Sequence, residues 1–436
     1  MNTNRLLISH ARWSRLEKIA FRFFFVFLGL QLLTENFWGN LFGGALFVWR
    51  LSEKIFVKPC LWLNHHFFHF KYISQSWTSF SASLHTIRDT VYLLIALIAC
   101  IVWTLVDRNR LNYSRLFYWF SRCAIVVLSC IEFSYGVIKL VPVQMSFPSF
   151  IDLQKPVGDL SPFDLLWTTF GYGAPYQMFT GFFEVIGAIL ILFNRTRMAG
   201  LLVLASVMVN VVMLNYTYQV GVLVTSFYIL LLILFLLAPY GRRLIGFFLD
   251  KKPAAMDYEE YRFAKSSTAK WLLIIAIAFI GVSFVLNARF ALNIYAKRNS
   301  INASRRYSLV KVFTVNDNAL PFVENDTVCW RTWGERVVDG KNYVTIATMK
   351  PGYFLTYTAD RDTARHRLSL HPFAQDDTTT LNFSYTEVSS TSWRLEGMMQ
   401  KKSVKVELQK IVPDTLLNLL KTKRTIITFD DESSNE

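Results

Sequence analysis

The sequence of 436 residues has few cysteines and few charged residues for its length. Its five cysteines form no CxxC pair and no set with metal-ligand spacing, which argues against a dithiol redox centre and against a zinc site. Charged residues make up 18% of the chain, whereas 53% of the residues are hydrophobic and 16% are aromatic. That balance excludes an ordinary soluble protein and predicts a membrane domain joined to a soluble one.

A cleavable signal peptide and a nucleic-acid partner are also not expected. The basic N-terminus is followed by an apolar stretch without a small-residue cleavage site, so we expect a membrane span there. The formal net charge is +15, but most Lys and Arg residues lie in short loops beside apolar segments. In such loops, basic residues set membrane topology and contact anionic lipid, so the expected partner is the lipid bilayer.

About seven apolar segments predict helices that cross the roughly 30 Å hydrocarbon core of a bilayer. They comprise residues 23–49, 91–106, 123–141, 176–193, 198–215, 220–238 and 271–292. Glu35 lies inside the first segment and predicts a kink or helix end there. His65 and His69 have a spacing that metal ligands can adopt on a helix, but no carboxylate or thiol set accompanies them, so aromatic packing at the interface is favoured.

The distribution of basic residues predicts the orientation of these helices. If residues 1–22 are cytoplasmic, the inner loops carry eighteen Lys and Arg residues and the outer loops seven. Basic residues concentrate on the cytoplasmic side of membrane proteins, which favours this orientation. Seven crossings then place the chain after residue 292 outside the cytoplasm.

The C-terminal part changes from apolar runs to short alternating segments, which are typical of antiparallel strands. We expect strands at residues 343–348, 353–359, 365–370, 380–385, 392–397 and 404–411. Turn signals fall at 339–342, 351–352, 360–362 and 376–377, and three tryptophans are expected core residues: Trp330, Trp333 and Trp393. Residues from about 300 onward, roughly 130 in number, suffice to bury a core of their own.

The predicted fold is therefore a membrane α-helical bundle followed by an extracytoplasmic antiparallel β-barrel or sandwich. We divide the chain into residues 1–112 with two helices and an external loop, 113–250 with a four-helix core, 251–292 with a connector and the seventh helix, and 293–436 with the β-rich domain.

Three ionisable residues lie inside predicted membrane helices: Glu132, Lys139 and Glu184. Each costs at least about 2.5–3.5 kcal/mol to insert, so such residues normally face the bundle interior and have partners. Glu132 and Lys139 are seven residues apart and share a helix face. We predict that Lys139 interacts with Glu184, and that one of the two carboxyl groups holds a proton near neutral pH.

Counted along their helices, these groups predict a polar funnel that descends from the outer face, roofed by the loop 143–175 with a short helix at 163–170. The candidate funnel residues are Glu132, Tyr135, Lys139, Gln144, Glu184, Asn210 and Asn215. The alternative is that these side chains only hold helices together, as many buried polar contacts in membranes do. Catalytic residues are not identified, and no metal ligand is predicted.

Residues 113–249 contain a series of short motifs. In order, they are residues 135–140 with Pro142 and Gln144, 156–158 with 161–162, 165–167, 171–172, Glu184 with Gly187, 194–196 and 210–216. These motifs together resemble those of bacterial DoxX-like membrane proteins. The extra N-terminal helices and β-rich tail are similar to long forms of that family. The resemblance implies a bacterial inner-membrane protein with a cytoplasmic N-terminus and a periplasmic C-terminal domain.

The resemblance implies an accessory subunit of a membrane redox system, because some relatives are subunits of a thiosulfate–quinone oxidoreductase. A quinone is then the cofactor to consider, although the chain departs from the redox pattern by lacking CxxC and haem-ligand motifs. Two other classes remain open: a transporter or lipid-handling protein that uses the funnel, and an anchor whose β-domain binds an exported partner. The sequence does not decide whether the protein is an enzyme.

Overall fold

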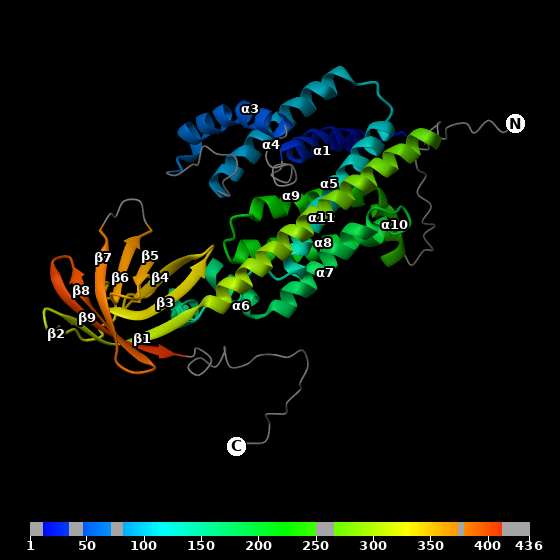
Figure 1. Ribbon diagram of the computed structural model, residues 1–436. Coiled ribbons are helices and arrows are strands. Elements are labelled where there is room, and N and C mark those ends of the chain that lie inside the picture. Colours follow the sequence, from blue (N-terminus) through cyan, green and yellow to red (C-terminus); the bar gives the residue numbers. More distant parts are fainter. Residues whose placement is uncertain (1–11, 35–46, 71–81, 250–265, 374–378, 412–436) are drawn as a thin grey trace. The chain divides into compact units, whose positions relative to one another are not determined.

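The computed structural model describes residues 12–34, 47–70, 82–249, 266–373 and 379–411 (Figure 1). Its internal contacts divide the chain into two compact units. The helical unit comprises Met1–Ser146 and Thr169–Asn293, and the β unit comprises Phe147–Thr168 and Ile294–Glu436. The boundary between Asn293 and Ile294 lies one residue from the predicted boundary between residues 292 and 293. The segment Phe147–Thr168 belongs to the β unit, although the prediction included it in the four-helix core.

The N-terminal part of the helical unit contains α1 (Arg15–Thr34), α3 (Phe47–Leu63) and α4 (Ala82–Val106), with α1 and α3 both packed against α4. α1 begins earlier than predicted because Ser14 and Glu17 form a reciprocal cap: the Ser14 amide donates to Glu17 Oε2 at 2.7 Å, and the Glu17 amide donates to Ser14 Oγ at 3.1 Å. The remainder of the predicted first span, including Glu35, lies mostly outside the described residues.

The central part of the helical unit is built from α5 (Ser114–Leu140), α7 (Ala174–Leu190), α8 (Arg197–Thr217) and α9 (Leu223–Leu237) (Figure 1). Their shared core consists of aliphatic side chains such as Leu128, Leu204 and Leu232. The remaining helices are α6 (Pro162–Tyr172), α10 (Gly241–Phe248) and α11 (Ser266–Ser304). α6 begins as predicted, because the Asp164 amide donates to Ser161 Oγ at 3.0 Å and Pro162 occupies the first helical position.

Several helices are long and apolar enough to cross a membrane. In the described part of the chain, length and composition identify five: Thr86–Val106, Ser114–Leu140, Arg197–Thr217, Leu223–Tyr240 and Ile274–Ser304. α4 exposes Ile98, Ile101 and Leu105, a face suited to lipid contact. The predicted number of seven crossings and their orientation stay predictions.

The β unit is organised around a closed antiparallel barrel of β1 (Arg306–Val315) and the strands from β3 to β9, while the two-residue β2 (Asn318–Ala319) pairs only with β1. Each strand of the series pairs with the next along the chain, and β1 closes the barrel by pairing with β9 (Figure 1). The other strands are β3 (Trp330–Val338), β4 (Lys341–Thr348), β5 (Phe354–Asp362), β6 (Arg367–Pro372), β7 (Leu381–Glu387), β8 (Ser392–Met399) and β9 (Lys402–Ile411).

The barrel interior is filled by side chains, as expected for a barrel of eight strands. Trp330, Trp333 and Trp393 are buried there as predicted, together with Phe313 and Phe383. All six predicted strands are present. The barrel thus decides between the two predicted architectures, because a sandwich would leave its two sheets unpaired at their edges.

The turns agree with the sequence at some positions and differ at another. Asp339 and Gly340 join β3 to β4 with φ of 51° and 77°, a pair of positive values that a two-residue hairpin turn requires. The turn predicted at residues 360–362 is wrong: these residues continue β5, and the reversal follows them, with His366 at φ 52°. Residues 376–377 lie outside the described residues.

The segment Phe147–Thr168 packs against the barrel. The ring of Phe150 lies 5.1 Å from that of Tyr307, and Thr332 Oγ1 donates to Gln154 Oε1 at 2.8 Å. Ile151 lies against Gly334, where a Cβ would approach Ile151 Cδ1 to 3.0 Å. These contacts make residues 147–168 part of the β unit, and the predicted roof over the membrane helices stays a prediction.

Candidate functional site

The candidate site lies where α5 and α7 cross. Gly136 faces Val185 and Gly181 faces Leu140, so the two helices run antiparallel at this point. A Cβ on Gly181 would lie 2.6 Å from the carbonyl oxygen of Gly136, a distance that no side chain could occupy. The crossing therefore depends on two glycines, as membrane helices that pack closely often do.

Lys139 and Glu184 each lie one helical turn from these glycines, and they form an ion pair. The Lys139 ammonium donates to Glu184 Oε1, which confirms the predicted interaction. Both side chains are buried, with 8% of Lys139 and 1% of Glu184 exposed. The missing side chains at the glycines allow the backbones to approach, so the lysine stem can reach the carboxylate across the crossing.

Glu132 is the third charged member of the cluster and lies on the same helix as Lys139. It is 1% exposed, and it is close enough to be repelled by Glu184 and attracted by Lys139. Within the described part of the chain, Glu132 Oε1 and Glu184 Oε2 are buried without hydrogen-bond partners. Two buried carboxyl groups therefore lie near one ammonium group, which contacts that of Glu184.

The charges of this cluster do not balance if all three groups are ionised. One lysine neutralises one carboxylate, and a second buried carboxylate without a partner is costly in a low-dielectric site. A single proton on one of the two carboxyl groups removes the excess charge. The arrangement is thus suited to hold and release a proton, or to bind a polar group that supplies the missing hydrogen bonds.

Two other predicted funnel residues lie near the end of α5. Tyr135 is half-buried and packs against the core of the helical unit. Gln144 follows the helix, and its backbone amide donates to the Ile138 carbonyl oxygen at 3.0 Å. Its buried Oε1 has no hydrogen-bond partner among the described residues.

The two asparagines predicted for the funnel are not joined to the charged cluster. Asn215 is buried, but its amide donates to Ser226 Oγ on α9 at 3.0 Å. Asn210 is exposed and corrects the prediction. The buried stripe of α8 contains Leu204, Met208 and Asn215, and Asn210 is two residues beyond Met208, which turns it about 200° away from that stripe.

Gln177 is a buried polar residue that the sequence reasoning missed. Its side-chain amide donates to the Met145 carbonyl oxygen and accepts from the Met145 amide, both at 3.0 Å. The link fixes the chain after α5 to α7. A helical signal was present, since Gln177 precedes Glu184 by seven residues and shares its face with Gly181.

The histidines near α3 make aromatic contacts. His66 stacks on Trp62 with 4.5 Å between ring centroids, and the ring of His65 lies 4.9 Å from that of His66. Across the residues that the structure describes, no three His, Cys, Asp or Glu side chains gather as a metal site would need.

Part of the chain is similar in sequence to a bacterial protein. It is 33% identical over 116 residues to a Bacillus subtilis (strain 168) protein described as "Uncharacterized protein YwoB", a match that covers 27% of this chain and 73% of YwoB. No family model matches the chain, and no solved structure matches it. The relation assigns no activity and does not bear on the resemblance to DoxX-like proteins. By the extent of this match, the chain belongs to the family of the Bacillus subtilis protein YwoB.

Proposed function

We propose that the helical unit is a proton-coupled transporter of the membrane, with Glu132, Lys139 and Glu184 as its proton-binding site. The observation that carries this proposal is the buried Lys139–Glu184 pair beside a second buried carboxyl group with an unpartnered oxygen. Three buried ionisable groups on two helices exceed what helix packing needs. Intramembrane ionisable groups of this kind commonly mark proton or substrate pathways.

The geometry suggests how a proton would change the helix contacts. Protonation of Glu184 removes the charge that holds Lys139 across the α5–α7 crossing. The flexible lysine stem is then free to turn toward Glu132, which is two helical turns away on its own helix. Such an exchange couples the protonation state to the packing of two helices, which is the property that a proton-coupled transporter needs.

Infrared difference spectroscopy of the full chain in liposomes tests this proposal. Between pH 5 and pH 8, we expect the absorption band of a protonated carboxyl group to change, and we expect Glu132→Gln or Glu184→Gln to remove that change. Asp159→Asn, at an exposed aspartate, is the matched control and should keep it. If neither glutamate variant alters the pH-dependent band, the cluster does not exchange protons and the proposal fails.

The DoxX-like motifs support a second proposal, a subunit of a quinone-linked membrane redox system. To test this role, the protein is purified from its native membrane in mild detergent. The purified sample is then analysed for bound quinone and for attached subunits. Stoichiometric quinone or an electron-transfer subunit would favour this role over transport. We also propose the orientation inferred from the basic loops, with the N-terminus cytoplasmic and the β unit periplasmic.

A further inference from the structure

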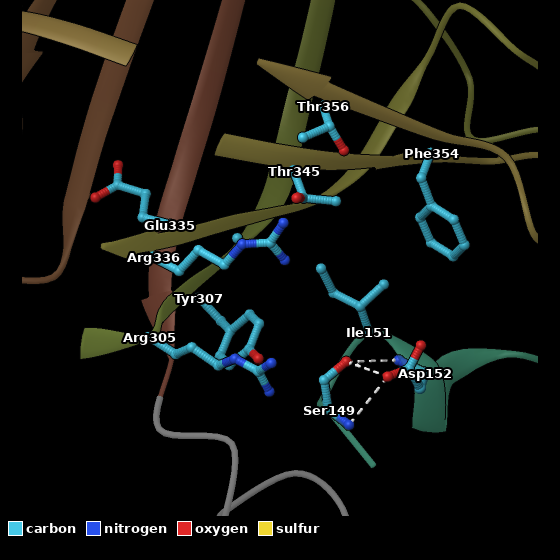
Figure 2. Close-up of a pocket in the computed structure, with 11 residues that line it drawn as sticks. Ser149, Ile151, Asp152, Arg305, Tyr307, Glu335, Arg336, Thr345, Phe354 and Thr356 are labelled. Carbon is cyan, nitrogen blue, oxygen red and sulfur yellow. Dashed lines mark hydrogen bonds between the residues drawn. The ribbon is translucent and has the colours of Figure 1, made fainter. Parts of the chain in front are cut away.

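The β unit contains a cavity of about 260 Å³ between the barrel and the segment Phe147–Thr168 (Figure 2). β1 and the residue before it, β3, β4 and β5 supply one side, and the 147–168 segment supplies the other. The lining residues used below are Arg305, Arg336, Thr345, Thr356, Ser149 and Ile151. A volume of this size exceeds the roughly 30 Å³ of one water several-fold, but lies just under the usual range for drug-sized ligands.

Two carboxylates, those of Glu335 and Asp152, also line this cavity. Glu335 accepts from the Arg361 guanidinium at 2.8 Å and from Trp333 Nε1 at 2.9 Å. Asp152 accepts from the amide and the hydroxyl of Ser149, at 3.1 and 2.6 Å. Glu335 is thus paired with Arg361. Asp152 keeps its negative charge, but in the described ranges it forms no ion pair with Arg305 or Arg336.

Two arginine side chains extend into the cavity. In Figure 2, the guanidinium groups of Arg305 and Arg336 both point into the cavity, toward the side where Ile151 lies. Arg305 hydrogen-bonds to Tyr307, and Arg336 lies 5.9 Å from the ring centroid of Tyr343. In the described ranges, neither arginine forms an ion pair with a carboxylate, so both guanidinium groups keep donors that a ligand can use.

A hydroxyl group adds a second, independent indication of a ligand. Thr345 lines the cavity, and its Oγ1 is buried without a hydrogen-bond partner among the residues with described positions. Thr356 lines the same side from the neighbouring strand. Arginine forks and hydroxyl donors are the groups that proteins use for phosphate oxygens, and Ile151 and Phe354 leave an apolar wall beside them.

We propose that this cavity binds a phosphate group that carries a small organic substituent. Phosphate offers enough acceptor oxygens for two guanidinium groups and a hydroxyl, whereas a single carboxylate would satisfy one arginine fork. The volume limits the ligand to a phosphate with a short substituent. Such a group belongs to a soluble phosphomonoester or to the headgroup of a phospholipid, and the chemistry of recognition is the same.

Thermal unfolding of the full chain in nanodiscs tests the site and separates the two sources. In phosphatidylcholine discs, inorganic phosphate is compared with sodium chloride at equal ionic strength. In a second arm without phosphate, discs that contain phosphatidic acid are compared with pure phosphatidylcholine. A rise in melting temperature only with phosphatidic acid indicates the lipid headgroup, and a rise with inorganic phosphate indicates a soluble ligand. Either response supports the site, provided that the arginine variants lose it.

Arg336→Gln and Arg305→Gln should each raise the half-saturating ligand concentration at least about tenfold. This is the loss of affinity expected when one charged hydrogen-bonding group is removed. Arg336→Lys keeps the charge and should bind more weakly than the native chain but better than Arg336→Gln. Arg365→Gln, at an arginine side chain that is 76% exposed, is the charge-matched control and should respond like the native chain. Near-ultraviolet circular dichroism checks that each variant keeps the tryptophan core. No response in either arm, or an equal response in Arg336→Gln, overturns the proposal.

Discussion

The side chains of Lys139 and Glu184 show how a single buried pair can join two helices. Both side chains are buried, and each lies one helical turn from a glycine at the helix crossing. Such a pair contributes little net stability when intact, because both groups lose their hydration. Loss of one partner is more costly, since the other charge then stays buried alone.

A double-mutant cycle measures this coupling. Lys139→Ala and Glu184→Ala should each reduce stability in nanodiscs by roughly 3–5 kcal/mol if the remaining group stays charged. The double variant should be more stable than the sum of the single effects predicts. A coupling energy near zero would show that the two side chains act in separate environments, contrary to the ion pair seen here.

Cys329 shows the effect of burial on a group in the barrel. Its side chain is fully buried, and burial, followed by the nearby charge of Asp326, raises the pKa of its thiol to about 11. We expect this thiol to resist alkylation at pH 8 in the folded chain and to react after unfolding, as seen by mass spectrometry of labelled peptides.

The same shift gives a pH dependence. A thiol whose folded pKa lies above its ordinary value of 9.0 binds its proton more tightly in the folded barrel. Its contribution to stability is therefore complete below pH 9 and is lost as the pH rises toward 11. A melting temperature of Cys329→Ser that falls as steeply as that of the native chain over this range would contradict the assignment.

At the scale of elements, the α5–α7 crossing and the barrel depend on backbone proximity. Gly181 and Gly136 allow the helix contact, and Gly187 and Gly200 play the same part between α7 and α8, where a Cβ would meet Leu204 and Ile191 side chains. Gly281 on α11 has open space around it, so its lack of a side chain serves no contact in the described structure.

This difference predicts opposite effects of one substitution. Gly181→Ala should destabilise the helical unit by about 1–3 kcal/mol, because the added Cβ overlaps the backbone of α5. Gly281→Ala should be neutral or slightly stabilising, since alanine stabilises a helix by about 1 kcal/mol relative to glycine. Thermal unfolding of both variants in the same detergent provides the comparison, and equal losses would contradict the close crossing.

At the scale of the whole molecule, the β unit draws residues from two distant parts of the sequence. Phe147–Thr168 is separated from β1 by more than a hundred residues, yet it supplies Phe150, Ile151 and Gln154 to the surface of the barrel. The barrel sequence alone therefore lacks part of its own packing.

A fragment of residues 294–436 should form the barrel but melt below the temperature at which it melts with its partner segment. Fusion of residues 147–168 ahead of it through a flexible linker should raise the melting temperature, because buried contacts are restored. The same fusion with Phe150→Ala and Ile151→Ala is the control. If both fusions melt at one temperature, the segment contributes nothing to barrel stability.

The proposed orientation makes a prediction for the complete chain. A reporter fused after residue 436 should behave as exported, and one fused within residues 239–270 should behave as cytoplasmic, because the basic loops concentrate on that side. Activity of the C-terminal reporter only in the cytoplasm would mean that the number of crossings differs by one from the predicted seven.

The sequence alone determined the local elements, because these depend on short-range patterns. Apolar runs predicted α7, α8 and α9 closely, whereas α5 begins nine residues before the predicted segment; alternation predicted β4 to β9. β1 and β3 were missed for a physical reason: each contains a register shift, between Val310 and Val312 and between Trp330 and Thr332, that interrupts the alternation. The Lys139–Glu184 pair was predictable because a buried charge in an apolar helix requires a partner.

Only the tertiary structure decided which distant parts meet. Closure of the barrel joins β1 to β9 across about a hundred residues, and no local pattern reports such a pairing. The placement of Phe147–Thr168 on the barrel, the cavity beside Arg305 and Arg336, and the exclusion of Asn210 from the charged cluster also depend on how surfaces fit. Sequence periodicity fixes which face of an element is apolar, whereas the partner of that face is chosen by shape and close packing.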